Sequence, residues 1–140
     1  MTKVVTAVEY LKEVRKNKAA KYKQTRSISR GESFPSKLEG AVFELLRLRV
    51  AAGELDMLTR YEKVSFLDGF VSWSIDFWAI ETETNTPVWI EAKGMKCQKW
   101  KLFERVWRDR GPGKLVLYMG DYRSPQEMPP IIPASFSDKR

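Results

Sequence analysis

Two carboxylates and an ammonium group stand inside apolar, strand-like stretches of this 140-residue sequence. Asp76 lies in the middle of "VSWSIDFWAIE" (71–81), while Glu91 and Lys93 lie at the end of "PVWIEAKG" (87–94). A charged group inside a strand that packs against a core costs free energy unless it is paired or holds a metal ion. These three side chains are therefore the first candidates for a functional site.

The short polar turn "TETNT" predicts that the two stretches pair as a β-hairpin. Side chains alternate between the two faces of a strand. In the second strand, Glu91 and Lys93 share a face opposite Ala92 and its apolar neighbours, and in the first strand Asp76 lies on the face opposite the apolar set. Pairing then gathers both carboxylates and the ammonium on one side of the sheet. The residues expected on the other face of the first strand are Val71, Trp73, Ile75, Phe77 and Ala79.

Two converging carboxylates form a site for a hard cation, and Lys93 supplies a counter-charge beside it. A carboxylate-held Mg²⁺ polarises a phosphodiester and lowers the pKa of its bound water. A nearby lysine can position that water or stabilise the developing charge. The alternative is structural, because Glu91 and Lys93 can also form a simple surface ion pair.

The composition excludes several other chemistries. The chain has no histidine and one cysteine, Cys97, so it lacks the Ser-His-Asp and Cys-His nucleophile systems and a conventional zinc site. Any metal must sit on oxygen ligands, which suit magnesium, calcium or manganese. No internal disulfide is possible, which favours a reducing cytoplasm. Neither a membrane span nor a glycine-rich phosphate loop is present, so we expect no membrane partner and no small-molecule cofactor.

The remaining elements must position these groups. Ser36 can cap a helix that ends near Gly53, and Glu39 completes a capping box. Glu39 is thus either a cap or a functional carboxylate, with Glu44 as a second choice. Further elements are a helical pattern at 5–19, a strand at 61–67, a basic helix at Lys96–Arg110 and a strand at 114–120. The order α-α-βββ-α-β predicts an α/β fold, a mixed sheet with helices on its faces.

Positive charge is concentrated at the N-terminus. Residues 1–30 hold nine Lys and Arg against two acids, which accounts for the whole net charge of +7. This segment is expected to be a basic arm that binds a polyanion, nucleic acid first, or else a solvated tail. Residues 31–120 are expected to form the core and the proline-rich residues 121–140 an extended tail. The candidate DNA contacts of the arm are Lys16, Lys18, Lys21, Lys23, Arg26 and Arg30.

The basic helix opens with Lys96, Lys99 and Lys101 beside the proposed site. These lysines favour phosphate contacts, although a solvated helix face also explains them. The aromatic residues of the same helix have core-facing spacing, which favours packing over base stacking. They are Trp100, Phe103 and Trp107.

The pattern "D76 … E91-A-K93", behind a helix that carries an acid, resembles the PD-(D/E)XK nuclease superfamily. The run "EAKG…KLFERVWRDRGPGKLVLYMG" is similar to small phage junction-resolving endonucleases, and "SKLE" resembles another phage branch of the superfamily. The resemblance covers roughly residues 34–120, with Ile75 where the motif name has proline. It implies a restriction-endonuclease-like core in which Glu39 is the helix-borne acidic residue.

This resemblance implies a Mg²⁺-dependent endodeoxyribonuclease, with Mn²⁺ as a substitute. Asp76 and Glu91 would bind the metal, assisted by Glu39 and the carbonyl of Ala92, and Lys93 would serve the attacking water. The implied substrate is the four-way (Holliday) junction. Two symmetric cuts imply a homodimer, encoded by a phage and acting in the cytoplasm of its host. The alternatives are a nuclease acting on flaps, nicks or invading duplex DNA, and a non-catalytic DNA-binding protein on a nuclease fold.

Overall fold

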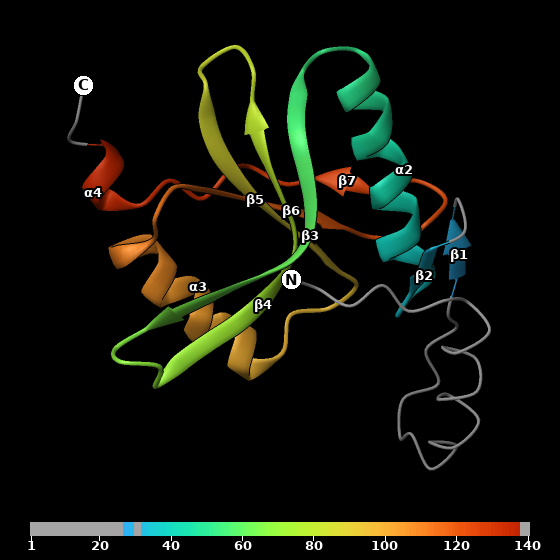
Figure 1. The fold of residues 1–140 in the computed structure, drawn as a ribbon. Helices are drawn as coiled ribbons and strands as arrows, with labels where there is room; N and C mark the ends of the chain where they lie inside the picture. Colours follow the sequence, from blue (N-terminus) through green and yellow to red (C-terminus); the bar gives the residue numbers. More distant parts are fainter. Residues whose placement is uncertain (1–26, 30–31, 138–140) are drawn as a thin grey trace.

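A five-stranded mixed sheet forms the centre of the protein, and helices lie on its faces (Figure 1). The computed structural model describes residues 27–29 and 32–137. The strand order is β3-β4-β5-β6-β7, with β5 and β6 parallel and the other neighbours antiparallel. The expected α/β class, with a mixed sheet flanked by helices, is confirmed.

The strands of this sheet are β3 (Leu55–Phe66), β4 (Val71–Glu81), β5 (Thr86–Lys93), β6 (Lys114–Met119) and β7 (Gln126–Glu127). The helices are α2 (Lys37–Ala51), α3 (Gln98–Arg110) and the short α4 (Ala134–Ser137). A separate two-stranded sheet pairs β1 (Ser27–Ser29) with β2 (Glu32–Phe34).

Two apolar clusters lie on opposite faces of the sheet and hold the helices against it. Because side chains alternate along a strand, Ile90 of β5 belongs to one cluster and its neighbour Trp89 to the other. Helix α2 fills the first cluster with Leu38, Val42, Phe43 and Leu46. Helix α3 fills the second with Trp100, Phe103 and Trp107, so the predicted packing role of these aromatics is confirmed.

Most element boundaries agree with the sequence prediction. The Oγ of Ser36 accepts a hydrogen bond from the N–H of Glu39 at 3.1 Å, which caps α2 as expected. Gly53 follows the helix with a φ of 80°, a backbone conformation that glycine adopts without strain. The predicted strands at 71–81, 87–94 and 114–120 and the helix at 96–110 match β4, β5, β6 and α3 to within two residues.

Strand β3 differs most from its prediction, because it begins at Leu55 rather than at residue 61. Its pairing with β4 is interrupted between Asp56 and Thr59, and two of its residues have positive φ: 56° at Met57 and 60° at Tyr61. Each irregularity breaks the two-residue alternation that identifies a strand in a sequence. This explains why the first half of β3 left no readable pattern.

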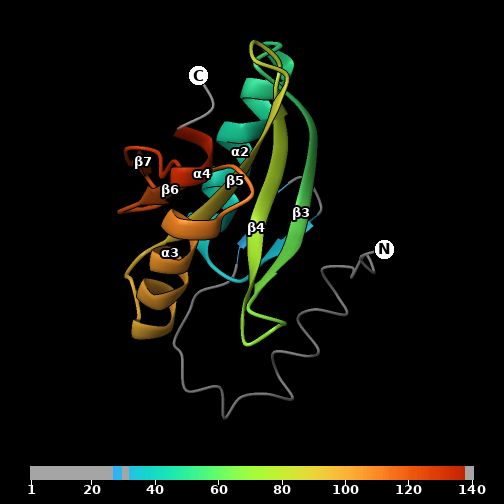
Figure 2. The ribbon, with the colours of Figure 1, turned by 90° about the vertical axis from the view of Figure 1, so that its left-hand side faces the viewer.

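The prediction that five apolar residues of β4 share one face is wrong. Ile75 packs in the α3 cluster, whereas Phe77 packs in the α2 cluster, although the two are separated by one residue. The face therefore changes at Asp76 and Phe77. Figure 1 shows that the β3–β4 hairpin bends near its middle, and Figure 2 shows its lower half running past α3.

The C-terminal segment contributes more than an extended tail. Residues of β7 pair with β6, and Ile131 is buried and bonded through its main chain to Leu115. The predicted helix at 5–19 lies outside the described residues, as do Lys16, Lys18, Lys21, Lys23, Arg26 and Arg30. Within residues 27–29 and 32–137, no helix is both long and apolar enough to cross a membrane.

Candidate functional site

The two predicted carboxylates meet where strands β4 and β5 part. The pairing of these strands runs from Glu81↔Thr86 to Phe77↔Ile90 and stops there. At the next position the main-chain N–H of Asp76 donates to Oε1 of Glu91 at 2.9 Å. The N–H of Ala92 in turn donates to Oδ2 of Asp76 at 2.9 Å. Each carboxylate therefore replaces a missing strand-to-strand hydrogen bond, and the fork places the two side by side.

Lys93 lies against the second carboxylate. Its Nζ is 3.3 Å from Oε2 of Glu91, which also accepts a hydrogen bond from Nε1 of Trp73 at 2.9 Å. The ammonium stands 4.0 Å from the ring centroid of Trp73 and 5.1 Å from that of Trp100. The side chains of Glu91 and Lys93 are only 3% and 16% exposed. Glu91 is therefore buried and Lys93 half-buried, so the two do not form a simple surface ion pair.

The carboxylate of Glu39 approaches the fork from α2. Its Oε2 accepts a hydrogen bond from the hydroxyl of Tyr61 at 3.1 Å and lies 3.4 Å from Nη2 of Arg60. Arg60 also bonds Glu32 and stacks on Phe34, with its guanidinium 4.0 Å from the ring centroid. The backbone N–H of Glu39 caps the helix through Ser36, while Oε2 of its carboxylate bonds Arg60 and Tyr61 of β3.

Burial dominates the electrostatics of all three acids. Desolvation, followed by the nearby charge of Asp76, raises the pKa of Glu39 to about 8 despite its bonds to Tyr61 and Arg60. Desolvation and the charge of Glu91 raise the pKa of Asp76 well above its usual range. The pKa of Glu91 is also raised by burial, against the opposing effect of Lys93. Perturbed acids clustered in this way are typical of functional sites.

The face of β4 changes around Asp76, because Ile75 packs in the α3 cluster and Phe77 in the α2 cluster. Asp76 interacts electrostatically with Glu39 of α2 and also with Glu91 and Lys93 of β5. Glu91 and Lys93 lie beside Trp73 of the α3 cluster. The three charged groups predicted to converge therefore meet at the gap between β4 and β5.

The oxygen donors present suit Mg²⁺, which proteins hold through one or two carboxylates while water and substrate oxygens complete its shell. Asp76 and Glu91 supply two carboxylates at the fork. In the described part of the chain, no three acidic or cysteine side chains are grouped so that they could hold a metal ion. Glu39 is kept from the pair by its bonds to Arg60 and Tyr61.

The lysines of α3 have different surroundings. Lys99 and Lys101 are exposed, and Nζ of Lys99 lies 5.6 Å from the ring centroid of Trp73. Lys96, which precedes the helix, instead pairs with the buried Glu104 at 3.1 Å. A cleft of about 420 Å³ opens beside the fork, lined by Lys63, Ser72, Trp73, Ser74 and Lys99.

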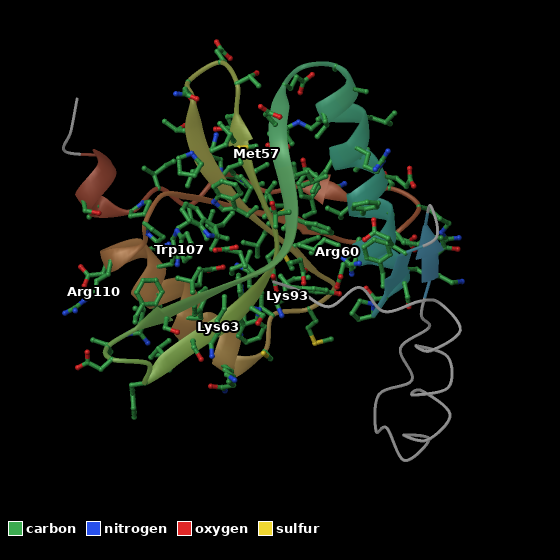
Figure 3. All side chains as sticks on the ribbon, in the orientation of Figure 1. Met57, Arg60, Lys63, Lys93, Trp107 and Arg110 are labelled. Atoms are coloured by element: carbon green, nitrogen blue, oxygen red, sulfur yellow. The ribbon has the colours of Figure 1, made fainter. Side chains whose placement is uncertain are left out.

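Sequence reasoning missed Arg60 and Tyr61, which hold Glu39. An arginine and a tyrosine in a polar stretch carry no signal of their own, and Tyr61 reaches Glu39 from a residue with a φ of 60°. Non-glycine residues rarely adopt that backbone conformation, and residues that do so are found preferentially at functional sites. Figure 3 labels Arg60 and Lys93 near the bend in β3.

Comparisons with protein-family models, with curated proteins and with solved structures found no match for this chain. The geometry of the site and general chemistry must therefore support any functional assignment.

Proposed function

We propose that this protein is a Mg²⁺-dependent, structure-selective endodeoxyribonuclease with a restriction-endonuclease-like core. The observation that carries the proposal is the fork of β4 and β5, where Asp76 and Glu91 bond each other's strands and Lys93 lies 3.3 Å from Glu91. Two buried carboxylates and one ammonium are the donor set expected for metal-assisted phosphodiester hydrolysis.

The cost of this arrangement supports a functional origin. Replacing buried charged groups by well-packed apolar residues is often neutral or stabilising. The fork nevertheless retains two carboxylates whose charged forms are opposed by desolvation. A free-energy cost concentrated at one point of a fold is typical of sites that bind or react.

Each residue of the site would have its own role in hydrolysis. When bound to Asp76 and Glu91, Mg²⁺ would polarise the phosphodiester and supply a bound water of lowered pKa. Lys93, fixed by Glu91 and the ring of Trp73, would orient the attacking water and stabilise the charge that develops on the phosphate. The carbonyl of Ala92 would assist the carboxylates. Glu39 would join them only on leaving Tyr61 and Arg60.

The proposed substrate is branched DNA, with the four-way junction as the leading candidate. Two symmetric cuts at such a junction require two copies of the site, which a homodimer supplies. The basic N-terminal segment would contact the DNA arms. We place this activity in the cytoplasm of a phage-infected bacterium. The alternative is a nuclease acting on flaps, nicks or invading duplex DNA, which would use the same site.

The test is a gel assay with a labelled four-way junction and a matched linear duplex, in Mg²⁺, in Mn²⁺ and in EDTA. Wild type should give paired cuts near the branch point in either metal and none in EDTA. Asp76→Asn should bind the junction but not cut it. Cutting by Asp76→Asn at the wild-type rate would refute the proposed metal site, and equal cutting of both DNAs would refute junction selectivity.

A second candidate function is DNA binding without catalysis. It is favoured by the engagement of Glu39 with Arg60 and Tyr61, which keeps a third carboxylate away from the pair. In that case the junction is bound equally well in Mg²⁺ and EDTA and is never cut. Calorimetric titration of Mg²⁺ into wild type and Asp76→Asn separates the two candidates. Only the nuclease requires a Mg²⁺ site that is lost in Asp76→Asn.

A further inference from the structure

A polar cleft opens where β4 continues without β5. Strand β4 runs from Val71, but β5 pairs with it only from Phe77 onward. Within the described residues, the stretch from Val71 to Asp76 therefore has a strand, β3, on one side only. Lys99, in the first turn of α3, lines the space that this leaves. The cleft has a volume of about 420 Å³ and borders the site through Trp73, whose Nε1 donates to Glu91.

The walls of the cleft are polar and positively charged. Ser72 and Ser74 point to the same face of β4 because they are two residues apart. Lys63 of β3 is paired in register with Ser74, so it extends this polar face, and Lys99 enters from α3. Among the described residues that line the cleft, none is acidic. Figure 3 labels Lys63 on the lower part of the β3–β4 hairpin.

Main-chain groups add further donors. The N–H of Asp76 points away from β3, because it donates to Glu91 of β5. N–H groups two residues apart on a strand point the same way, so those of Ser72 and Ser74 face the open side. The residues that line the cleft thus carry two ammonium groups and two hydroxyls, and the open edge of β4 adds main-chain donors beside them. This set of donors fits the oxygens of a phosphodiester.

Trp73 is poorly placed to stack on a base. Its ring lies under the ammonium groups of Lys93 and Lys99 and packs against Trp100, with ring centroids 5.1 Å apart. A base needs a free ring face to stack. The cleft therefore offers contacts to the sugar–phosphate backbone rather than to bases.

We propose that the cleft lined by Lys63, Ser72, Ser74 and Lys99 binds the phosphodiester backbone of the nucleic-acid strand next to the cleavage site, without reading its sequence. Its place beside the reaction rests on the proposed function, but its affinity for nucleic acid requires no catalysis. Lys63 and the two serines thereby become binding residues, in addition to Lys99.

The experiment measures binding by fluorescence anisotropy in EDTA, where no metal-dependent cleavage occurs. Full-length wild type and the double variant Lys63→Ala/Lys99→Ala are titrated onto a labelled single strand and a labelled duplex over a range of salt concentrations. The double variant should lower the slope of log affinity against log salt by about 0.7 per lysine for the single strand and about 0.9 for the duplex. Different base sequences should give the same change.

Two control variants show whether the position of the removed charges determines the change in salt slope. Lys63→Arg/Lys99→Arg keeps both charges and should keep the wild-type slope. Arg47→Ala/Arg110→Ala removes two exposed charges from α2 and from the far end of α3, and it should also leave the slope unchanged. Thermal unfolding followed by circular dichroism checks that each variant is folded. An unchanged slope in the folded alanine double variant, or an equal drop in the Arg47/Arg110 variant, would overturn the proposal.

A further arm distinguishes a nucleic-acid strand from a free anion. Amide NMR shifts of Ser72 and Ser74 are followed on addition of inorganic phosphate or of a short single strand. Shifts at a much lower concentration of the strand support the proposal, and equally tight binding of phosphate would overturn it. The wild-type cleavage assay is run in parallel. If the protein never cuts DNA but the alanine double variant lowers the salt slope, only the nuclease function is refuted. If the protein cuts DNA and the alanine double variant keeps the wild-type slope, only the role of the cleft is refuted.

Discussion

At the scale of single residues, burial makes the charged forms of Glu39, Asp76 and Glu91 costly. Desolvation is the largest influence on the pKa of each of these groups. Hydrogen bonds from main-chain N–H groups to Asp76 and Glu91 and the ammonium of Lys93 offset part of that cost. Without a cation, the three carboxyl groups therefore favour their protonated forms more than exposed acids do.

The metal-free protein should lose stability as pH rises. Burial raises the pKa of Glu39 from 4.5 to about 8, so the native state binds more protons than the unfolded chain between these values. This contribution to stability is complete below pH 4.5 and is lost as pH rises through about 8. Thermal unfolding in EDTA should show a falling Tm over this window, and Glu39→Gln should flatten the fall. An identical fall in Glu39→Gln would mean that Glu39 is already ionised.

Mg²⁺ should restore stability where the carboxyl groups are ionised. A cation that binds only the native state stabilises it by RT ln(1 + [Mg²⁺]/Kd). Because ionised carboxylates bind the cation best, the gain in Tm should be larger at pH 8 than at pH 5. Thermal unfolding with and without Mg²⁺ measures it, with Asp76→Asn as the control that should gain little. The same gain in Asp76→Asn would place the cation elsewhere.

Lys93 should matter for rate more than for binding. Lys93→Ala removes the charge that would stabilise the reacting phosphate, and the loss of one such donor typically lowers kcat by about 10²–10³-fold. Single-turnover cleavage of the junction measures this loss, while the affinity in EDTA reports binding. Lys101→Ala, an exposed change on α3, should weaken affinity without a comparable loss of rate. A rate that survives Lys93→Ala would assign this lysine to pairing with Glu91 only.

At the scale of elements, helix α3 is held to the sheet by aromatic side chains. Trp107 is fully buried, its Nε1 donates to the carbonyl of Gly113 at 2.9 Å, and its ring lies 5.4 Å from that of Trp89. Trp100, two helical turns earlier, contacts Trp73 beside the site. The same packing that stabilises α3 therefore also orients the lysines at its N-terminal end.

Trp107→Ala should destabilise the fold by about 3–5 kcal/mol, because it leaves a cavity and removes a buried hydrogen bond. Urea denaturation followed by circular dichroism measures the loss. Leu102→Ala on the exposed face of the same helix should change stability by no more than about 0.5 kcal/mol. Equal losses for the two substitutions would contradict the packing described here.

At the scale of the whole molecule, a charge-balanced body carries a strongly basic N-terminal segment. Deleting residues 1–26 removes eight Lys and Arg and two acids while keeping β1. The deletion should weaken DNA binding and flatten its salt dependence by up to about 0.9 per cation that contacts a phosphate. Anisotropy titrations at several salt concentrations measure this. An unchanged slope would show that the segment does not contact DNA.

The sequence by itself determined the fold class, most element boundaries and the two carboxylates with their lysine. These features depend on local rules: apolar periodicity, a serine cap on α2 and the rarity of charges such as Asp76 inside apolar strands. Such rules act within a few residues along the chain, so one sequence is enough to apply them.

Only the tertiary structure decided how these groups meet. The change of face at Asp76, the separation of β4 from β5 and the bonds of Arg60 and Tyr61 to Glu39 depend on irregular backbone and on residues more than twenty positions apart. The cleft beside β4 and Lys99 arises in the same way, from an edge that none of the described strands covers. Strict alternation predicted one face for the apolar residues of β4, but the bend in β3 and β4 sends Ile75 and Phe77 to opposite clusters. Long-range packing fixes such bends, and a local pattern in the sequence does not record them.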